Sequence, residues 1–121
     1  MTVSQGFAEF IGEQLADFAP VHLRRMFGGM GVFRDGLMFA LVDDDVLYFK
    51  TDGEGSAAFA AEGLKPFSYA TKKGEHTLTS YWRAPERCLD DAKEMATWAG
   101  RAFAVALKAA KPKRSGKPLR R

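Results

Sequence analysis

Residues 24–50, RRMFGGMGVFRDGLMFALVDDDVLYFK, hold two tight-turn signals within one short, mostly apolar segment. Asp35-Gly36 is a strong signal for a two-residue hairpin, because glycine accepts the positive φ of a type I′ turn. Asp43-Asp44-Asp45 marks a second turn. Strands this short and joined this tightly must run antiparallel. The segment therefore predicts a β-meander, with strands over residues 22–27, 30–34, 37–42 and 46–50.

The third of these strands, 37–42, is apolar at every position. An uninterrupted apolar run is typical of a central strand that is covered on both faces. Further along the chain, residues 66–70 and 76–83 are rich in aromatic and β-branched residues and are bounded by turn signals, so we expect two more strands there.

Three helices are predicted around this sheet. Apolar residues recur at helical spacing over 3–18, where Thr2 and Gln5 have the spacing of a capping box. A short helix is expected over 57–62, with Ser56 as its cap. A long helix is expected to begin after Asp90 or Asp91. The predicted fold class is α+β: an antiparallel meander packed with an N-terminal, a short middle and a C-terminal helix.

The charge is divided unevenly along the 121 residues. Residues 108–121 hold seven lysines and arginines and no acid, which leaves residues 1–107 with eleven basic and fifteen acidic residues, a net charge of −4. We therefore expect one folded domain over 1–108 and a disordered basic tail over 109–121. A single cysteine, no secretory signal and no apolar run near the ~18 residues of a membrane span favour a cytoplasmic protein without a membrane partner.

The C-terminal helix carries two adjacent apolar stripes, a wider face than one contact with a sheet needs. Either the helix is sunk deeply in its own core, or part of the face packs against a second subunit. The second interpretation predicts a homodimer. Its candidate dimer face is the second stripe, made of Met95, Trp98, Ala102 and Val105.

Three patterns that suggest chemistry have simpler structural interpretations. The Gly28–Gly31 cluster sits between strands and lacks the lysine and helix of a phosphate-binding loop, so we expect it to shape a turn or bulge. The Asp43–Asp45 run lacks the ligand spacing of a calcium loop, so we expect a solvated turn and no metal. Nothing in the sequence pairs Cys88 with His22 or His76, so we expect no catalytic residues.

Two further features are candidates for binding. Tyr81, Trp82 and Arg83, with Phe67 and Tyr69 nearby, suggest a small ligand-binding site or, more simply, core residues of strands. The basic tail suggests weak, sequence-independent contact with nucleic-acid phosphates. Its candidate contacts are Lys111, Lys113, Arg114, Lys117, Arg120 and Arg121.

The chain resembles the N-terminal domain of the TfoX family over about residues 5–107. The resemblance rests on the first helix, the 24–33 segment, the following hairpins, and Tyr81-Trp82 before the last helix. The signature residues are Arg24, Arg25, Met26, Phe27, Gly28, Gly29 and Gly31. Full-length regulators of this family have a second, helical domain, whereas this sequence ends in a basic tail.

The resemblance implies an α+β domain that forms dimers and is associated with regulators of competence genes. The family has no established active site, cofactor or metal, so it implies none here. We therefore expect a small non-enzymatic regulatory or protein-interaction domain, a homodimer with a regulatory protein as a further partner. The alternatives are nucleic-acid association through the tail and ligand binding.

Overall fold

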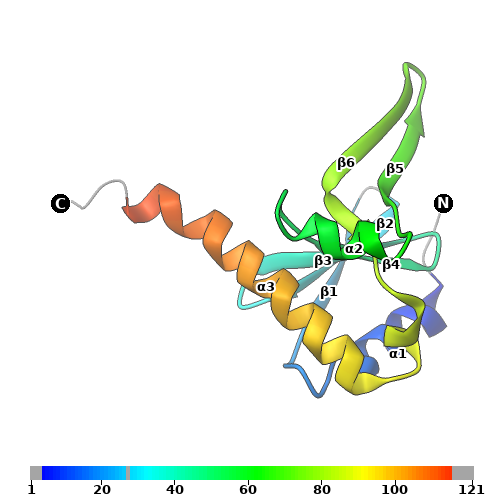
Figure 1. Ribbon diagram of the computed structural model, residues 1–121. Coiled ribbons are helices and arrows are strands. Elements are labelled where there is room, and N and C mark those ends of the chain that lie inside the picture. The colour runs from blue at the N-terminus through cyan, green and yellow to red at the C-terminus, as the bar shows by residue number, and fades with distance from the viewer. Residues whose placement is uncertain (1–3, 27, 116–121) are drawn as a thin grey trace.

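The structure is a computed structural model that describes the backbone of residues 4–26 and 28–115 and the side chains up to residue 110. Six strands form one antiparallel sheet with the order β1-β2-β3-β4-β6-β5 (Figure 1). The strands are β1 (His22–Met26), β2 (Gly29–Arg34), β3 (Leu37–Asp43), β4 (Val46–Lys50), β5 (Pro66–Thr71) and β6 (Gly74–Arg83). The predicted meander is confirmed, and each predicted strand is found to within two residues at either end.

Both predicted turns have the backbone that a tight hairpin requires. Between β2 and β3, Asp35 and Gly36 have φ values of 52° and 80°. Between β3 and β4, Asp44 and Asp45 have φ values of 54° and 59°. Positive φ at both central positions matches the right-handed twist of the flanking strands, and aspartate tolerates it better than most residues.

The first helix is shorter than the sequence predicted. Helix α1 spans Gln5–Gln14, with Ser4 rather than Thr2 at its N-cap. The Ser4 hydroxyl accepts a hydrogen bond of 3.2 Å from the backbone N–H of Phe7, which satisfies one of the free donors of the first turn. Thr2 lies outside the described residues. After Gln14 the chain turns, which carries Phe18 onto the core ring of Phe39 at 5.6 Å.

The other helices also differ from prediction at their ends. Helix α2 spans Ser56–Ala61 and is capped by Gly55, so Ser56 lies inside it. A short 3-10 helix, η1 (Glu86–Leu89), precedes α3 (Ala92–Ser115). The Asp91 carboxylate accepts hydrogen bonds from the N–H groups of Lys93 and Glu94 and so caps α3. No helix in the described part of the chain is long and apolar enough to cross a membrane.

Helix α3 crosses the predicted boundary between domain and tail. Its backbone continues to Ser115, so residues 109–115 are helical where the sequence predicted disorder. Ala109, Ala110 and Lys111 are strong helix formers and extend a helix that is already anchored in a core, whereas Pro112 in the last turns lacks the N–H that a helix interior uses. The last six residues, 116–121, lie outside the described residues.

A β-bulge controls which side chains of β3 reach the core. Val32 pairs with Ala40, but Phe33 pairs with Met38, which leaves Phe39 as an extra residue. A bulge interrupts the alternation of side chains along a strand. As a result Phe39, Ala40 and Val42 are all fully buried, whereas Met38 and Leu41 are half-buried.

All three α-helices contribute to one core on one face of the sheet. The core joins Ile11 and Leu15 of α1, Phe59 of α2, and Met95, Ala99 and Phe103 of α3 to the buried side chains of β2, β3 and β4. The half-buried apolar side chains between them, such as Leu41 and Tyr48, do not belong to it. The prediction that β3 is covered on both faces is therefore wrong, because the helices pack on the face of Phe39, Ala40 and Val42, whereas Met38 and Leu41 on the other face are only half-buried.

Phe39 and Phe49 are the largest fully buried side chains of the described residues, and the Phe39 ring meets that of Phe103 edge-on at 5.9 Å. We expect Phe39→Ala to lower the free energy of unfolding by about 3–5 kcal/mol, because the substitution leaves a cavity among aromatic rings. Denaturant titration would measure the loss. The matched control is Tyr69→Ala, where the ring is 41% exposed and the expected loss is below about 1 kcal/mol. Equal losses would contradict this description of the core.

Candidate functional site

The sheet face opposite the helices, called here the open face, presents half-buried apolar side chains that lie outside the helix-covered core. Side chains alternate along a strand, so those between buried residues point to the other side of the sheet. Tyr48 stands between the buried Leu47 and Phe49, and it is half-buried and pairs with Leu41 on β3. The open face comprises Met26, Phe33, Met38, Leu41, Tyr48 and Phe67, each half-buried.

Gly31 makes the close packing on this face possible. A Cβ placed there would lie 2.7 Å from the sulfur of Met26, 2.8 Å from the sulfur of Met38 and 2.8 Å from a ring carbon of Phe33. Any larger residue would therefore push three side chains of the open face apart. This glycine of the family signature is thus needed for the shape of the surface.

The other signature residues that the structure describes have local roles. Gly29 has no room for a Cβ, which would collide with the carbonyl oxygen of Val42. Gly28 has a positive φ of 84°, which favours glycine. Arg24 is exposed, with its guanidinium 5.2 Å from the centre of the Phe33 ring, and Arg25 is also exposed. Phe27 lies outside the described residues.

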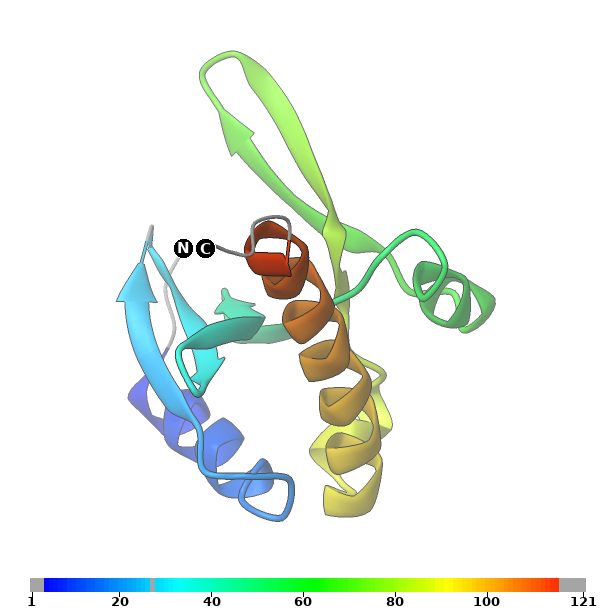
Figure 2. The same ribbon diagram turned by 90° about the vertical axis from the view of Figure 1, so that its left-hand side faces the viewer.

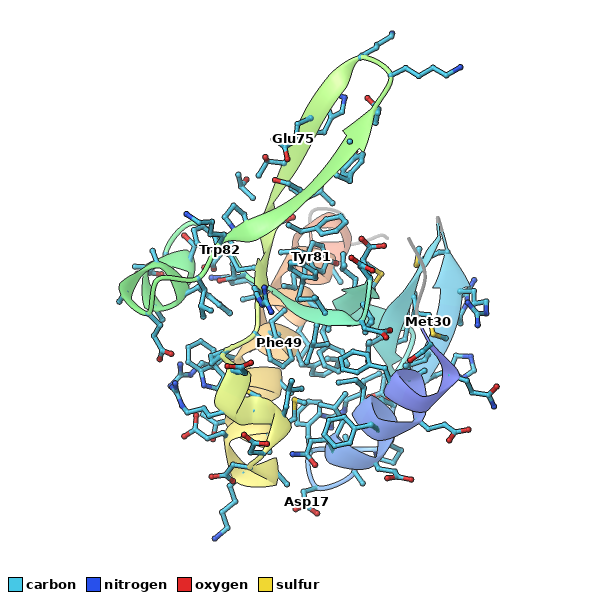
Figure 3. All side chains as sticks on the ribbon, turned by 90° about the vertical axis from the view of Figure 1, so that its right-hand side faces the viewer. Asp17, Met30, Phe49, Glu75, Tyr81 and Trp82 are labelled. Carbon is cyan, nitrogen blue, oxygen red and sulfur yellow. The ribbon has the colours of Figure 1, made fainter. Side chains whose placement is uncertain are left out.

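The hairpin of β5 and β6 extends beyond the rest of the sheet as an arm, defined here as residues 68–80, all exposed (Figures 1 and 2). β6 pairs with β4 at Tyr81, which lies opposite Lys50, the last residue of β4. From there towards the tip of the arm, β5 is the strand with which β6 pairs. Figure 3 shows Glu75 on the arm, well above Phe49 in the core. An isolated two-stranded ribbon is at best marginally stable in water.

An aromatic ladder runs from the open face onto the arm. The rings of Tyr48 and Phe67 meet edge-on at 4.9 Å, Phe67 and Tyr69 stack at 5.7 Å, and Tyr69 stacks on His76 at 5.6 Å. Tyr69 and Leu78 of the arm remain 41% and 38% exposed. The ladder makes one continuous apolar stripe with the open face.

Charges of opposite sign mark the two ends of this stripe. Lys72 and Lys73 form the turn at the tip of the arm, and both are exposed. At the other end lies the acidic turn, Asp43–Asp45. Its Asp45 carboxylate accepts a hydrogen bond of 2.8 Å from the backbone N–H of Ser4 at the start of α1. Within residues 4–26 and 28–115, no three His, Cys, Asp or Glu side chains are grouped so as to hold a metal ion.

The candidate dimer face on α3 is buried within the domain, so that prediction is corrected. Met95, Trp98 and Ala102 are 0%, 5% and 2% exposed, and Val105 is half-buried. The ring of Trp98 packs edge-on against Phe59 of α2 at 4.9 Å. The wide apolar face of α3 is used by the sheet and α2 together, which explains its width without a second subunit.

The candidate ligand residues Tyr81, Trp82 and Arg83 do not converge. Trp82 packs against the core near Phe59, with their rings 6.2 Å apart. Tyr81 points to the opposite side, where the Lys50 ammonium lies 5.2 Å from its ring centre. Burial raises the pKa of the Tyr81 hydroxyl. These neighbours occupy alternate faces of β6 and form no common pocket.

The candidate catalytic residues are also separated. Cys88 is fully buried in η1, and burial raises the pKa of its thiol to about 12. His22 is on the edge strand β1, whereas His76 is on the arm, where it is hydrogen-bonded to the Thr71 hydroxyl at 3.1 Å. The structure therefore brings no histidine of β1 or the arm into the Cys88 environment.

The candidate nucleic-acid contacts fall at the end of the chain. Lys111, Lys113 and Arg114 lie in the last turns of α3, and Lys117, Arg120 and Arg121 lie outside the described residues. Their contact with nucleic acid stays a prediction. The sequence does not predict Met38, Leu41 and Tyr48 as residues of the sheet face opposite the helices, because an apolar run carries no signal for which of its side chains the helices cover.

The described residues form a two-layer α+β domain, with three helices packed on one face of the sheet and a projecting hairpin of β5 and β6. The TfoX N-terminal domain family matches residues 13–106, and the chain belongs to this family. The resemblance carried by the 24–33 signature is thus confirmed.

One relative is DNA transformation protein TfoX1 of Aliivibrio fischeri (strain ATCC 700601 / ES114), which is 43% identical to the chain over 49 residues. The match covers 40% of this chain and 23% of that relative. The chain thus spans about a quarter of the length of the relative that it matches.

The buried, protonated thiol of Cys88 gives a direct test of the description of this region. We expect no reaction of Cys88 with a thiol reagent in the native protein at pH 8, because only the thiolate is nucleophilic and its pKa is about 12. Reaction should become complete in denaturant, where the pKa returns to about 8.5. Absorbance of the released chromophore would measure both rates. Rapid labelling of the native protein at pH 8 would contradict the burial described here.

Proposed function

We propose that this chain is a non-enzymatic regulatory module that acts by binding protein partners through its open face and arm, in the control of competence for DNA transformation. The observation that carries the proposal is the apolar aromatic stripe from Leu41 and Tyr48 to Tyr69, which lies outside the core that the helices cover and is half-buried to exposed. The membership of the family and the name of the relative, a DNA transformation protein, support the biological context.

The composition of the open face supports a protein partner. Tyrosine, phenylalanine and methionine are enriched at the cores of protein interfaces, and the open face is built from these residues and one leucine. Burial of apolar area contributes about 25 cal/mol per Å². An uncovered stripe of half-buried side chains therefore favours association once a partner of complementary shape is present.

The surroundings of Cys88, the candidate nucleophile, support a role without catalysis. The Cys88 thiol is held protonated by burial, and the two histidines belong to the edge strand and the arm. Catalysis by a cysteine–histidine pair needs both groups within hydrogen-bond reach, and this arrangement does not supply it.

The experiment compares two double variants in a native host from which the gene has been deleted. The open-face variant, Met38→Glu with Tyr48→Glu, introduces charges where a partner would bury apolar side chains. The matched control, Thr97→Glu with Ala104→Glu, places the same charges at exposed positions of α3. We expect the control to restore transformation frequency and transcripts of competence genes, and the open-face variant to restore at most about a tenth, the effect of 1.4 kcal/mol on binding.

Circular dichroism and thermal melting would establish that both variants fold. Full restoration of transformation by a folded open-face variant would contradict the proposal.

A second candidate function is weak association with nucleic acid through the basic tail. The concentration of seven cations in residues 108–121, beside a body of net charge −4, supports it. In the same strain, neutralising the tail with Lys117→Gln, Arg120→Gln and Arg121→Gln separates the two functions. Loss of transformation with an intact open face would favour the tail, whereas full restoration would favour the open face alone.

A further inference from the structure

We propose that the partner of the open face is a second copy of this chain, bound face to face so that the arm of each copy lies across the sheet of the other and its lysine tip reaches the acidic turn. This inference rests on the proposed function and names one occupant of the same surface.

The distances from Lys50 and Tyr81 to the tip of the arm and to the acidic turn are similar, as a two-fold arrangement requires. From Tyr81 to the start of β6 at Gly74, the arm extends seven residues past the last residue of β4. At about 3.3 Å per residue this is about 23 Å. In the opposite direction, the acidic turn lies five residues from Lys50, about 17 Å. A two-fold axis near Lys50 and Tyr81 would therefore place the tip of each arm close to the level of the acidic turn of the other copy.

The apolar surfaces of the stripe are self-complementary in this arrangement. Phe67, Tyr69 and Leu78 point to the same side of the hairpin, because Phe67 pairs with Leu78 and Tyr69 lies two residues from Phe67. They would pack on Met38 and Leu41 of the other copy. In a two-fold interface each such contact occurs twice. The arm gains in this way the packing that a two-stranded ribbon needs for stability.

The charges fix the register of the two copies. Lys72 and Lys73 carry the positive tip, and the facing turn supplies the carboxylates of Asp43 and Asp44. Asp45 is already bound to the backbone of Ser4, so the first two aspartates are the groups for the lysines to meet. Exposed ion pairs contribute only about 0.2–1 kcal/mol each. They therefore act mainly by excluding other registers.

The same charges disfavour a nucleic acid on the open face. Burial raises the pKa of Tyr48, the nearby Arg83 lowers it, and Asp43 and Asp44 raise it, so both carboxylates lie near the ladder. Carboxylates at this position repel phosphates. The combination of a basic tip and an acidic end suits a second copy, which supplies both signs in reversed order.

The test uses two full-length charge variants and their mixture. The tip variant is Lys72→Glu with Lys73→Glu, and the turn variant is Asp43→Lys with Asp44→Asn, in which asparagine keeps the positive φ of 54° at that position. Sedimentation equilibrium should show a dimer for the unaltered chain and a dissociation constant at least about tenfold larger for each variant alone. Each variant by itself places like charges opposite each other.

The equimolar mixture should restore the dimer to within about threefold of the original dissociation constant, because the tip of each variant then faces a turn of opposite charge at both contacts. Lys93→Glu on the exposed side of α3 is the control and should leave the dimer unchanged. Restoration by mixing is a result that simple destabilisation of either variant cannot produce.

Three outcomes would overturn the inference: a monomer at every concentration, a dimer that neither variant weakens, or binding of single-stranded DNA to the open face of a monomer. If the chain is monomeric but the open-face variant still fails to restore transformation, the second-copy inference is wrong and the proposed function stands. If the chain forms the dimer but the open-face variant restores transformation in full, the proposed function is wrong and the second-copy inference stands.

Discussion

The bulge at Phe39 brings this ring to the same face of the sheet as Ala40 and Val42, although neighbouring side chains of a regular strand point to opposite faces. Because of it, β3 directs its phenylalanine, alanine and Val42 into one core, where Phe39 meets rings from the turn after α1 and from α3. Arg34 lies over two of these rings, with its guanidinium 4.9 Å from the centre of Phe18 and 4.6 Å from that of Phe103. One aromatic contact thus joins the N-terminal turn, the central strand and the last helix.

The other face of the sheet lies outside this core, and its apolar side chains are half-buried. Met38 and Leu41 emerge on that side, and Gly31 gives the space in which Met26, Met38 and Phe33 pack together. The hairpin of β5 and β6 extends this surface beyond the sheet through the ladder from Tyr48 to His76. Side chains from five strands thus make up the open face, whereas the bulge of β3 contributes Phe39 to the core on the opposite side.

The sequence predicted the elements well because their signals are local. Asp35-Gly36 needs only its own backbone to specify a hairpin, and the spacing of apolar residues in α3 follows from the helix alone. The distribution of contacts among elements is not local. Nothing in Trp98 itself reveals that its ring packs against Phe59 of α2, and nothing in the apolar run of β3 reveals its bulge. For this reason the sequence predicts a dimer face on α3, whereas in the structure Met95, Trp98 and Ala102 are buried within the domain.

We propose that the open face is accessible in a single molecule and that a partner covers it in the assembly that functions. Hydroxyl-radical footprinting over a range of protein concentrations tests it most directly, since the side chains of Tyr48, Phe67 and Tyr69 report on the open face and those of Phe39 and Phe49 report on the core. We predict that the first three are modified readily in dilute protein and become protected as the concentration rises, while the core rings stay protected throughout. Equal modification of the two sets in dilute protein, or modification of the first set that does not change with concentration, would contradict the account.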